Sequence, residues 1–251
     1  VCSETCVGRI RSVGVILYDA DKISEYRKDC DGGYEWACTL LGYIYSKGHG
    51  VKQDYKQAMT LFRKAADQGH ARAQYELGLM YDNGKGVKQD YAQAVIWYRK
   101  AADQGVARAQ YKLGLMYGNG QGVKQDYKQE MTWYRKAADQ GYARAQYNLG
   151  TMYKDGQGIK QDYKQAVIWY RKAADHGYAR AQYNLGNMYK DGRGVKQDDK
   201  QAVKWYRKAG DQGVAQAQFG LGLMYNDGQG IKQDYRQAVK WYRKAAAQRF
   251  A

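Results

Sequence analysis

The chain has 251 residues and a formal net charge of +16, with 26 tyrosines and no proline. No apolar run approaches the roughly 20 residues that a membrane-spanning helix needs, which argues against such a helix, and the mean hydropathy is −0.83. The positive charge is compatible with binding to nucleic acid or an anionic membrane, but the basic residues recur at fixed positions among acids. We therefore disfavour both and expect an acidic protein partner.

The N-terminal part, residues 1–34, is interpreted as a separate segment that ends in a half-repeat. Residues 1–15 fit no repeat, whereas residues 18–33 match the second half of one. Terminal units of repeat arrays are atypical because they cover the open end of the stack, so we expect a capping helix here. The chain begins at Val1 rather than Met, which leads us to expect a processed or trimmed start.

The cysteines are confined to this end of the chain: Cys2, Cys6, Cys30 and Cys38. An even number clustered at one end favours disulfides and an oxidising compartment. Four cysteines allow three pairings; a turn would bring Cys30 near Cys38, and Cys2 and Cys6 would pair locally. The alternative for Cys30 is a small buried residue standing where later copies carry alanine. The spacings and the lack of a nearby histidine disfavour a metal site.

The rest of the chain is a repeat of fixed period. Six copies of 36 residues occupy 35–70, 71–106, 107–142, 143–178, 179–214 and 215–250. A period of this size predicts an all-α solenoid of antiparallel helix pairs, in which each unit buries its apolar face against the next.

The first helix of each repeat, helix A, is predicted over about 143–153 in the fourth copy. Ala145, Leu149, Met152 and Tyr153 form one apolar stripe at helical spacing. Gly150 lies in mid-helix, where glycine is unfavourable, and its recurrence predicts the close approach of a neighbouring helix. A glycine after Asp155 is expected to end the helix in the left-handed conformation.

The second helix, helix B, is predicted to begin at Asp162 as N-cap, with Gln165 completing a variant of the capping box. Trp169 and Tyr170 lie on its expected buried face. Its outward lysines are interpreted as a solvated surface: Lys172, Lys208 and Lys244. In the last copy the stop glycine is absent, so we expect the final face to be exposed or covered by a partner or by removed residues.

The pattern A-x-A-x-x-L-G-x-x-Y-x-x-G-x-G-V-x-x-D-x-x-x-A-x-x-W-Y-x-x-A-A-x-x-G over residues 18–250 resembles Sel1-like repeats. The resemblance implies a right-handed α-superhelix whose A helices line a concave face, and a non-catalytic adaptor role. Some bacterial members are periplasmic, some are immunity proteins against secreted lipase toxins, and others act in signalling or host-cell entry. The spacing of Cys30 and Cys38 also resembles the disulfide-stapled repeats of cysteine-rich members.

The sequence offers no candidate catalytic constellation. His49 stands in a loop, and His70 and His176 stand in variable turn positions, where we expect these two to be solvated. The glycine-rich loops precede an Asp-capped helix, and that carboxylate would repel a phosphate, so we reject a phosphate-binding loop. We expect no enzyme activity, no cofactor, no metal and no small-molecule substrate.

Comparison among the copies identifies candidate partner-binding positions on helix A. Positions required by the fold should stay fixed, whereas positions facing a partner are free to vary; arginine and tyrosine are also frequent binding hot spots. The predicted set is Arg72, Tyr75, Leu79, Arg108, Tyr111, Leu115, Arg144, Tyr147, Thr151, Lys154, Arg180, Tyr183, Asn187, Lys190, Phe219 and Asn226. The alternative for the tyrosines is packing between adjacent A helices.

We therefore predict a non-enzymatic scaffold, monomeric or weakly dimeric, that holds a protein with acidic or aromatic contact residues in its concave groove. The expected location is exported, in a bacterial periplasm, and the sharper hypothesis is an immunity protein against a lipase-type effector. The alternatives are an adaptor in envelope signalling or host-cell entry and, from a different class, binding of polyanions through the basic surface.

Overall fold

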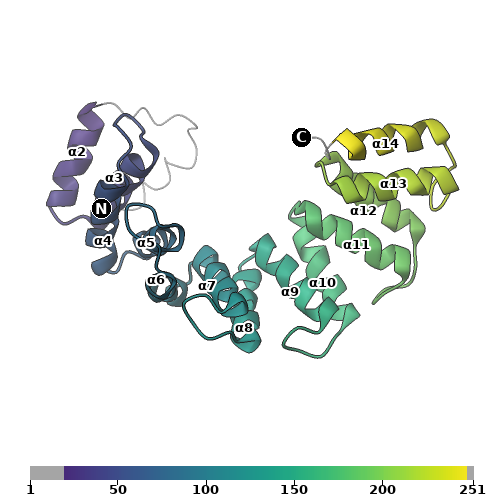
Figure 1. The fold of residues 1–251 in the computed structure, drawn as a ribbon, viewed down its shortest axis with the longest axis horizontal. Helices are drawn as coiled ribbons and strands as arrows, with labels where there is room; N and C mark the ends of the chain where they lie inside the picture. Colours follow the sequence, from purple (N-terminus) through teal and green to yellow (C-terminus); the bar gives the residue numbers. More distant parts are fainter. Residues whose placement is uncertain (1–19, 248–251) are drawn as a thin grey trace. The chain divides into compact units, whose positions relative to one another are not determined.

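The computed structural model describes residues 20–247, and every regular element in that range is an α-helix, as the periodicity predicts (Figure 1). The chain divides into two compact units, Val1–Gln104 and Gly105–Ala251. Within the described residues the first unit holds α2 and the helices of two repeats. The second holds the helices of four.

The helices alternate between the A and B positions of the repeat. The first unit contains α2 (Ala20–Asp31), α3 (Glu35–Lys47), α4 (Tyr55–Asp67), α5 (Ala71–Asn83) and α6 (Tyr91–Asp103). The second contains α7 (Ala107–Asn119), α8 (Tyr127–Asp139), α9 (Ala143–Asp155), α10 (Tyr163–Asp175), α11 (Ala179–Asp191), α12 (Asp199–Asp211), α13 (Ala215–Asp227) and α14 (Tyr235–Ala247). The A helices are α3, α5, α7, α9, α11 and α13, and each is followed by its B helix.

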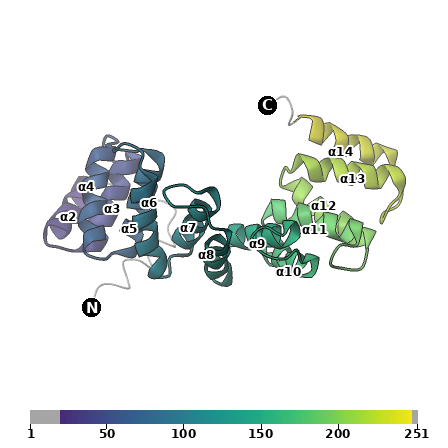
Figure 2. The same cartoon turned by 60° about the horizontal axis from the view of Figure 1, so that its bottom comes forward.

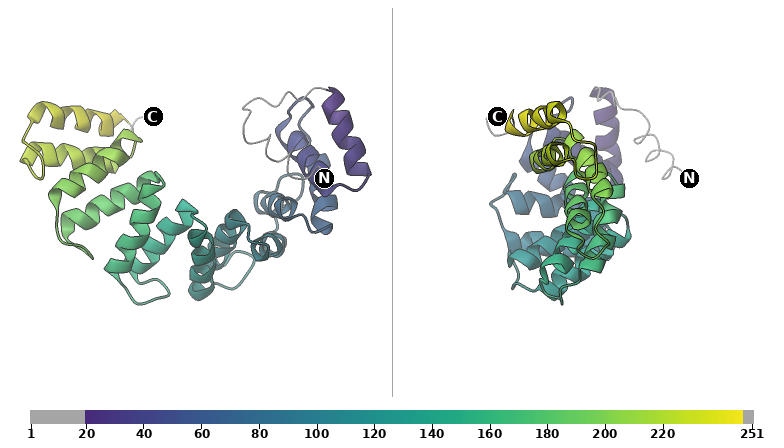
Figure 3. Two further views of the ribbon diagram at one scale, coloured as in Figure 1. Left: turned by 180° about the vertical axis from the view of Figure 1, so that it is seen from behind. Right: turned by 90° about the vertical axis from the view of Figure 1, so that its right-hand side faces the viewer.

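Inside each unit, an A helix packs against the B helix of its own repeat and against the preceding B helix. The turned views show the antiparallel pairs stacked in chain order within each unit (Figures 2 and 3). The predicted half-repeat is present as α2, which packs on α3. This is the arrangement expected of a solenoid, in which contacts are made with sequence neighbours.

The mid-helix glycine is explained by the aromatic ring of helix B. A Cβ added to Gly150 would lie 2.6 Å from the ring of Tyr170, which is fully buried. The same glycine–ring contact recurs in every repeat, with Phe62 in place of tyrosine in the first. The predicted close approach is therefore confirmed, and its source is one aromatic side chain lying flat on the helix backbone.

Helix B begins at an aspartate N-cap, but the capping box is only half formed. The Asp162 carboxylate accepts a hydrogen bond from the Gln165 N–H at 3.0 Å. The Asp162 N–H donates to the Tyr153 carbonyl at 2.9 Å. In a capping box this Asp162 N–H would donate to the Gln165 side chain, but here it donates to a carbonyl of helix A. The prediction of a complete capping box was therefore wrong in this half.

A buried glutamine joins successive repeats. In the second copy the Gln74 amide donates to the Ala66 carbonyl at the end of the preceding B helix, at 3.2 Å. Its Oε1 accepts from Gln104 at 2.8 Å. One period earlier, the residues aligned with Ala66 and Gln74 are Cys30 and Cys38, which form a disulfide with a Cα–Cα distance of 4.7 Å. We call the contact between the end of one B helix and the following A helix a repeat joint. The first joint is therefore a disulfide, whereas the second is made by a hydrogen bond.

Candidate functional site

The predicted partner-binding residues lie on A helices in both units. Those on α5, in the first unit, are Arg72, Tyr75 and Leu79; the others lie on α7, α9, α11 and α13 of the second. They fall into an exposed arginine column, a half-buried aromatic column and two half-buried columns of varying chemistry. We call the surface formed by these columns the A-helix face of each unit.

The arginine column is exposed to solvent. Arg72, Arg108, Arg144 and Arg180 are all exposed, and none of them forms an ion pair within residues 20–247. In the last repeat Gln216 takes the arginine position. An exposed guanidinium without a carboxylate partner keeps its full capacity for bidentate recognition.

The aromatic column packs against rings of helix B, mostly in tilted geometry, and is only partly exposed. Tyr147 lies 5.8 Å from the ring of Tyr170 and 5.2 Å from the ring of Tyr178, which precedes the next A helix. Equivalent stacks join Tyr75 to Tyr98, Tyr111 to Tyr134 and Tyr142, Tyr183 to Tyr206, and Phe219 to Tyr242. Phe219 is the exception in exposure, at 53%.

The varying columns have an internal role that comparison of the copies missed. The Tyr98 hydroxyl donates to the Asp82 carboxylate at 2.9 Å. In the fourth repeat Thr151 and the Tyr170 hydroxyl lie 3.1 Å apart, and in the fifth the Tyr206 hydroxyl donates to Asn187 at 2.6 Å. Thr151 and Asn187 therefore each provide a hydrogen-bond partner for a buried tyrosine hydroxyl. Variation at these positions does not by itself indicate contact with a partner protein.

Burial sets the ionisation of these tyrosines. It raises the pKa of Tyr170 to about 12, and the Thr151 hydrogen bond acts in the opposite direction. Burial is likewise the main reason that the pKa of Tyr98 is raised, and the neighbouring Asp82 carboxylate adds to it. The buried hydroxyls therefore remain protonated donors over the physiological range.

In the third repeat the carboxylate that pairs with the buried tyrosine hydroxyl comes from helix B, whereas in the second repeat it comes from helix A. Glu130 stands where the remaining copies carry alanine, is 8% exposed, and is hydrogen-bonded to the Tyr134 hydroxyl. A Cβ on Gly118, the position of Asp82 in the second repeat, would lie 2.5 Å from that carboxyl group. Burial raises the pKa of Glu130, and Glu130 Oε2 has no hydrogen-bond partner within the described chain.

The lysines of helix B are not simply solvated. The Lys172 ammonium lies 4.2 Å from the centroid of the Trp169 ring, one turn earlier on the same helix. Lys208 and Lys244 sit on Trp205 and Trp241 in the same way. All three lysines are exposed, as expected of a solvated surface, and each also makes a cation–π contact with a tryptophan ring of its own helix. The indole N–H of Trp169 has no hydrogen-bond partner within the described chain.

Of the four cysteines, Cys30 and Cys38 are bonded to each other and buried. Cys2 and Cys6 lie outside the described residues. Of the histidines expected to be solvated, His70 is half-buried: it caps α5, and its Nδ1 lies 2.8 Å from the Thr39 hydroxyl. The Ala73 N–H also donates to this nitrogen. Burial lowers the pKa of His70, so it caps the helix as a neutral ring.

Within residues 20–247 no group of three or more His, Cys, Asp or Glu side chains is placed to hold a metal. No helix in that range is both long and apolar enough to cross a bilayer.

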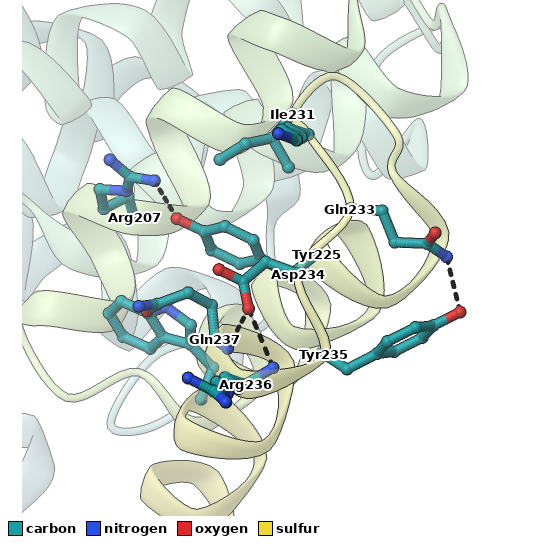
Figure 4. Close-up of a pocket in the computed structure, with 10 residues that line it drawn as sticks. Arg207, Tyr225, Ile231, Gln233, Asp234, Tyr235, Arg236 and Gln237 are labelled. Atoms are coloured by element: carbon teal, nitrogen blue, oxygen red, sulfur yellow. Dashed lines mark hydrogen bonds between the residues drawn. The ribbon is translucent and has the colours of Figure 1, made fainter.

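A depression of about 1000 Å³ lies at the last repeat, between α12, α13 and α14 (Figure 4). Three of its polar side chains are engaged: Arg207 donates to the Tyr225 hydroxyl at 2.6 Å, and Asp234 caps α14. In earlier repeats of this unit the corresponding helix start is covered by a glycine of the next loop, as Gly194 covers Tyr163. The depression therefore lies at the place that the next loop covers in earlier repeats.

Comparison with known proteins agrees with this architecture. The family model for the Sel1 repeat matches residues 37–70, 71–106, 107–142, 143–178, 179–214 and 215–250. A protective antigen of uropathogenic Escherichia coli strains that displays an SLR fold is 43% identical with a TM-score of 0.89, over 90% of this chain and 48% of that one. A Sel1 repeat protein from Oxalobacter formigenes is 35% identical with a TM-score of 0.75, over 91% and 88%.

A short match of another kind involves respiratory enzymes. A stretch of 25 residues is 76% identical to the nitrate reductase beta chain of Bacillus subtilis and 80% identical to the respiratory nitrate reductase 2 beta chain of Escherichia coli. The chain spans 5% of the length of these curated relatives. The match is too short to transfer an activity.

Proposed function

Because the chain belongs to the Sel1 repeat family, whose fold typically serves protein interaction, we propose that it is a non-enzymatic scaffold that binds a partner protein on its A-helix face. The observation that carries the proposal is the arginine column. Arg108, Arg144 and Arg180 are exposed, lack ion pairs within the described chain and each lie one turn from a half-buried aromatic ring. Arginine beside an aromatic is a frequent composition of binding hot spots.

The opposite surface is a weaker candidate. In the second half of helix B, arginines and lysines contact tyrosine and tryptophan rings of the same or the next repeat, as Lys136 contacts Trp133 at 4.1 Å and Arg135 contacts Trp169 at 5.0 Å. Cations already engaged in this way have less to offer a partner than the unpaired arginines of helix A.

In its sharper form the proposal places the chain in the periplasm of a bacterium as an immunity protein that blocks a secreted lipase-type effector. The buried Cys30–Cys38 disulfide supports an oxidising compartment. An adaptor in envelope signalling or host-cell entry is the alternative, and the two are separated by whether the chain protects cells that produce a periplasmic lipase effector encoded beside its gene.

The binding face is tested by site-specific photo-crosslinking in an envelope extract. A photoreactive residue at exposed Asp155, which ends α9 beside Lys154 of the A-helix face, is expected to capture a discrete protein, whereas the same residue at exposed Lys164 on helix B is not. A double substitution, Arg144→Ala with Tyr147→Ala, should abolish capture while the helical content is retained. Capture from Lys164 alone, or steeply salt-dependent capture of nucleic acid, would refute the proposal.

A further inference from the structure

The third repeat carries a pair of residues that the other copies lack. Glu130 stands on α8 where the other five copies have alanine, and Gly118 stands on α7 where they have serine, aspartate, lysine or asparagine. The two positions are in contact, because a Cβ added to Gly118 would lie 2.5 Å from Cδ and Oε1 of Glu130. The glycine therefore leaves the space that the larger glutamate fills.

This space is closed to solvent and holds little that would stabilise a charge. Glu130 is 8% exposed, and its Oε2 has no hydrogen-bond partner within the described chain. It forms no ion pair with a lysine or arginine of residues 20–247. An ionised carboxylate in such a place loses its hydration without compensation, so the folded chain favours the neutral acid.

The groups that act on Glu130 and its neighbours come from the three helices packed here, α7, α8 and α9. On α8 the Tyr134 hydroxyl is hydrogen-bonded to Glu130, and on α7 the Tyr111 ring stacks on the Tyr134 ring at 5.6 Å. The groups that act on Tyr111 are Tyr142, Tyr178, Arg144 and Asn148. Burial raises the pKa of Glu130, and the hydrogen bond with Tyr134 opposes this only in part.

The same hydrogen bonds connect the buried acid to the next repeat. The Tyr134 hydroxyl is bonded both to Glu130 and to the Asn148 side chain on α9. Asn148 is also bonded to Tyr111, which belongs to the aromatic column of the A-helix face. A charge on Glu130 has to be hydrated, and water can reach its carboxyl group only if the helices around it separate.

We propose that Glu130 makes the packing of the third repeat sensitive to protons: as a neutral acid it holds α7, α8 and α9 together, and its ionisation loosens them. The more distant helices α11, α12 and α13 have no such residue and stay packed. This inference concerns the fold and does not depend on the proposed binding of a partner protein.

The direction of the effect follows from the raised pKa. The unfolded chain releases this proton near the ordinary value of 4.5, whereas the folded chain keeps it to higher pH. The contribution of neutral Glu130 to the free energy of unfolding is therefore fully present below pH 4.5 and is lost as pH rises through the folded pKa.

Hydrogen exchange of the full chain tests where this happens. Wild type is compared at equal pH, from about 4.5 to 8.5, with Glu130→Gln, which has nearly the same shape and stays neutral; the intrinsic exchange rate is then common to both. In α7, α8 and α9 the ratio of wild-type to variant exchange rates should rise by at least about threefold over this range. In α11, α12 and α13 the ratio should stay constant.

Two further variants serve as controls. Glu130→Ala restores the residue of the other copies and should remove the pH dependence as Glu130→Gln does, so that the result does not rest on how one glutamine packs. Asp139→Asn removes an exposed carboxylate from the end of the same helix and should leave the pH dependence as in wild type.

Carbon-13 NMR of the glutamate carboxyl groups measures the ionisation directly. The chain has five glutamates, and the Glu130 signal is the one that Glu130→Gln removes. It should titrate at higher pH than the signal of an exposed glutamate such as Glu25. Titration together with Glu25, an exchange ratio that does not change with pH, or loss of the pH dependence in Asp139→Asn would overturn the inference.

Discussion

Replacing His176 by glutamine is expected to stabilise the protein, because it completes a hydrogen bond that the fourth repeat lacks. At the corresponding place in the second repeat, the Gln104 amide donates to Gln74 Oε1 at 2.8 Å and also to the Gly69 carbonyl at 2.8 Å. In the fourth repeat the residue aligned with Gln104 is His176, and Gln146 Oε1 is buried without a partner within the described chain.

The size of the expected stabilisation follows from the burial of the unpaired acceptor, Gln146 Oε1. Gln146 is 3% exposed, and its amide already donates to the Ala138 carbonyl at 3.0 Å, so the side chain is fixed and only its oxygen is unsatisfied. A completed hydrogen bond contributes about 0.5–1.5 kcal/mol net, and ordering an exposed glutamine side chain offsets part of it. We expect His176→Gln to raise the free energy of unfolding by about 0.5–1 kcal/mol.

Urea denaturation provides the assay. The midpoint should rise without a change in the slope, and the melting temperature should increase by about 1–4 °C for a chain of this size. His176→Ala, which removes the ring without adding a donor, should give no such gain. The reciprocal change Gln140→His, which removes the donor to Gln110, should destabilise the third repeat by a similar amount. If His176→Gln behaves like His176→Ala, the unsatisfied acceptor is not a source of instability and the reasoning fails.

Three further predictions concern single features of the fold. Gly118→Asp should destabilise by about 2 kcal/mol or more because its side chain meets the Glu130 carboxyl group, and adding Glu130→Ala should recover most of that loss, giving a coupling above about 1 kcal/mol in a double-mutant cycle measured by urea denaturation. Because the pKa of His70 is lowered in the folded protein, the contribution of the neutral ring to the free energy of unfolding is present above the unfolded pKa of about 6.5 and is lost as pH falls through the folded pKa. Thermal melts from pH 7.5 to 5 should show a melting temperature that falls with pH, and His70→Val should make that dependence weaker. Reduction of the Cys30–Cys38 disulfide, which closes a loop with a sequence separation of 8, should cost about 2–3 kcal/mol and increase hydrogen exchange in α2 first; uniform loss of protection along the chain would contradict the local role of the bond.

The parts of the fold that every repeat shares were predictable from the sequence. Gly150 marked a close helix approach because an unfavourable residue recurred at one position, and Asp162 marked a helix start because its carboxylate can accept backbone N–H groups. Repetition made these signals strong, since the same packing problem is solved in the same way in each copy. The reciprocal half of the capping box failed because the competing acceptor, the Tyr153 carbonyl, lies on another helix.

Variation between copies was harder to interpret. Thr151 and Asn187 differ from the leucines at the same position in other repeats, and such differences suggest a surface that faces a partner. Each also lies within hydrogen-bond distance of a tyrosine hydroxyl 19 residues later in the chain, which gives an internal reason for the difference. A buried hydroxyl needs a partner but does not specify which helix supplies it. A residue can therefore differ between repeats either because it satisfies a hydrogen bond inside its own repeat or because it contacts a partner protein. Exposed side chains without an ion pair, such as the arginines, are the more direct candidates for binding.

The covalent joint at Cys30–Cys38 follows from the same requirement. At later joints a glutamine fixes the end of one B helix to the start of the next A helix, as Gln146 does with Ala138 at 3.0 Å, and packing from both neighbouring repeats protects that bond. The helix α2 is the first described helix, and among the described helices it packs against α3. A single hydrogen bond contributes about 1 kcal/mol, whereas a short disulfide loop contributes about 2–3 kcal/mol. The Cys30–Cys38 bond therefore holds α2 on α3 more strongly than the glutamine hydrogen bond holds the corresponding helices of later repeats.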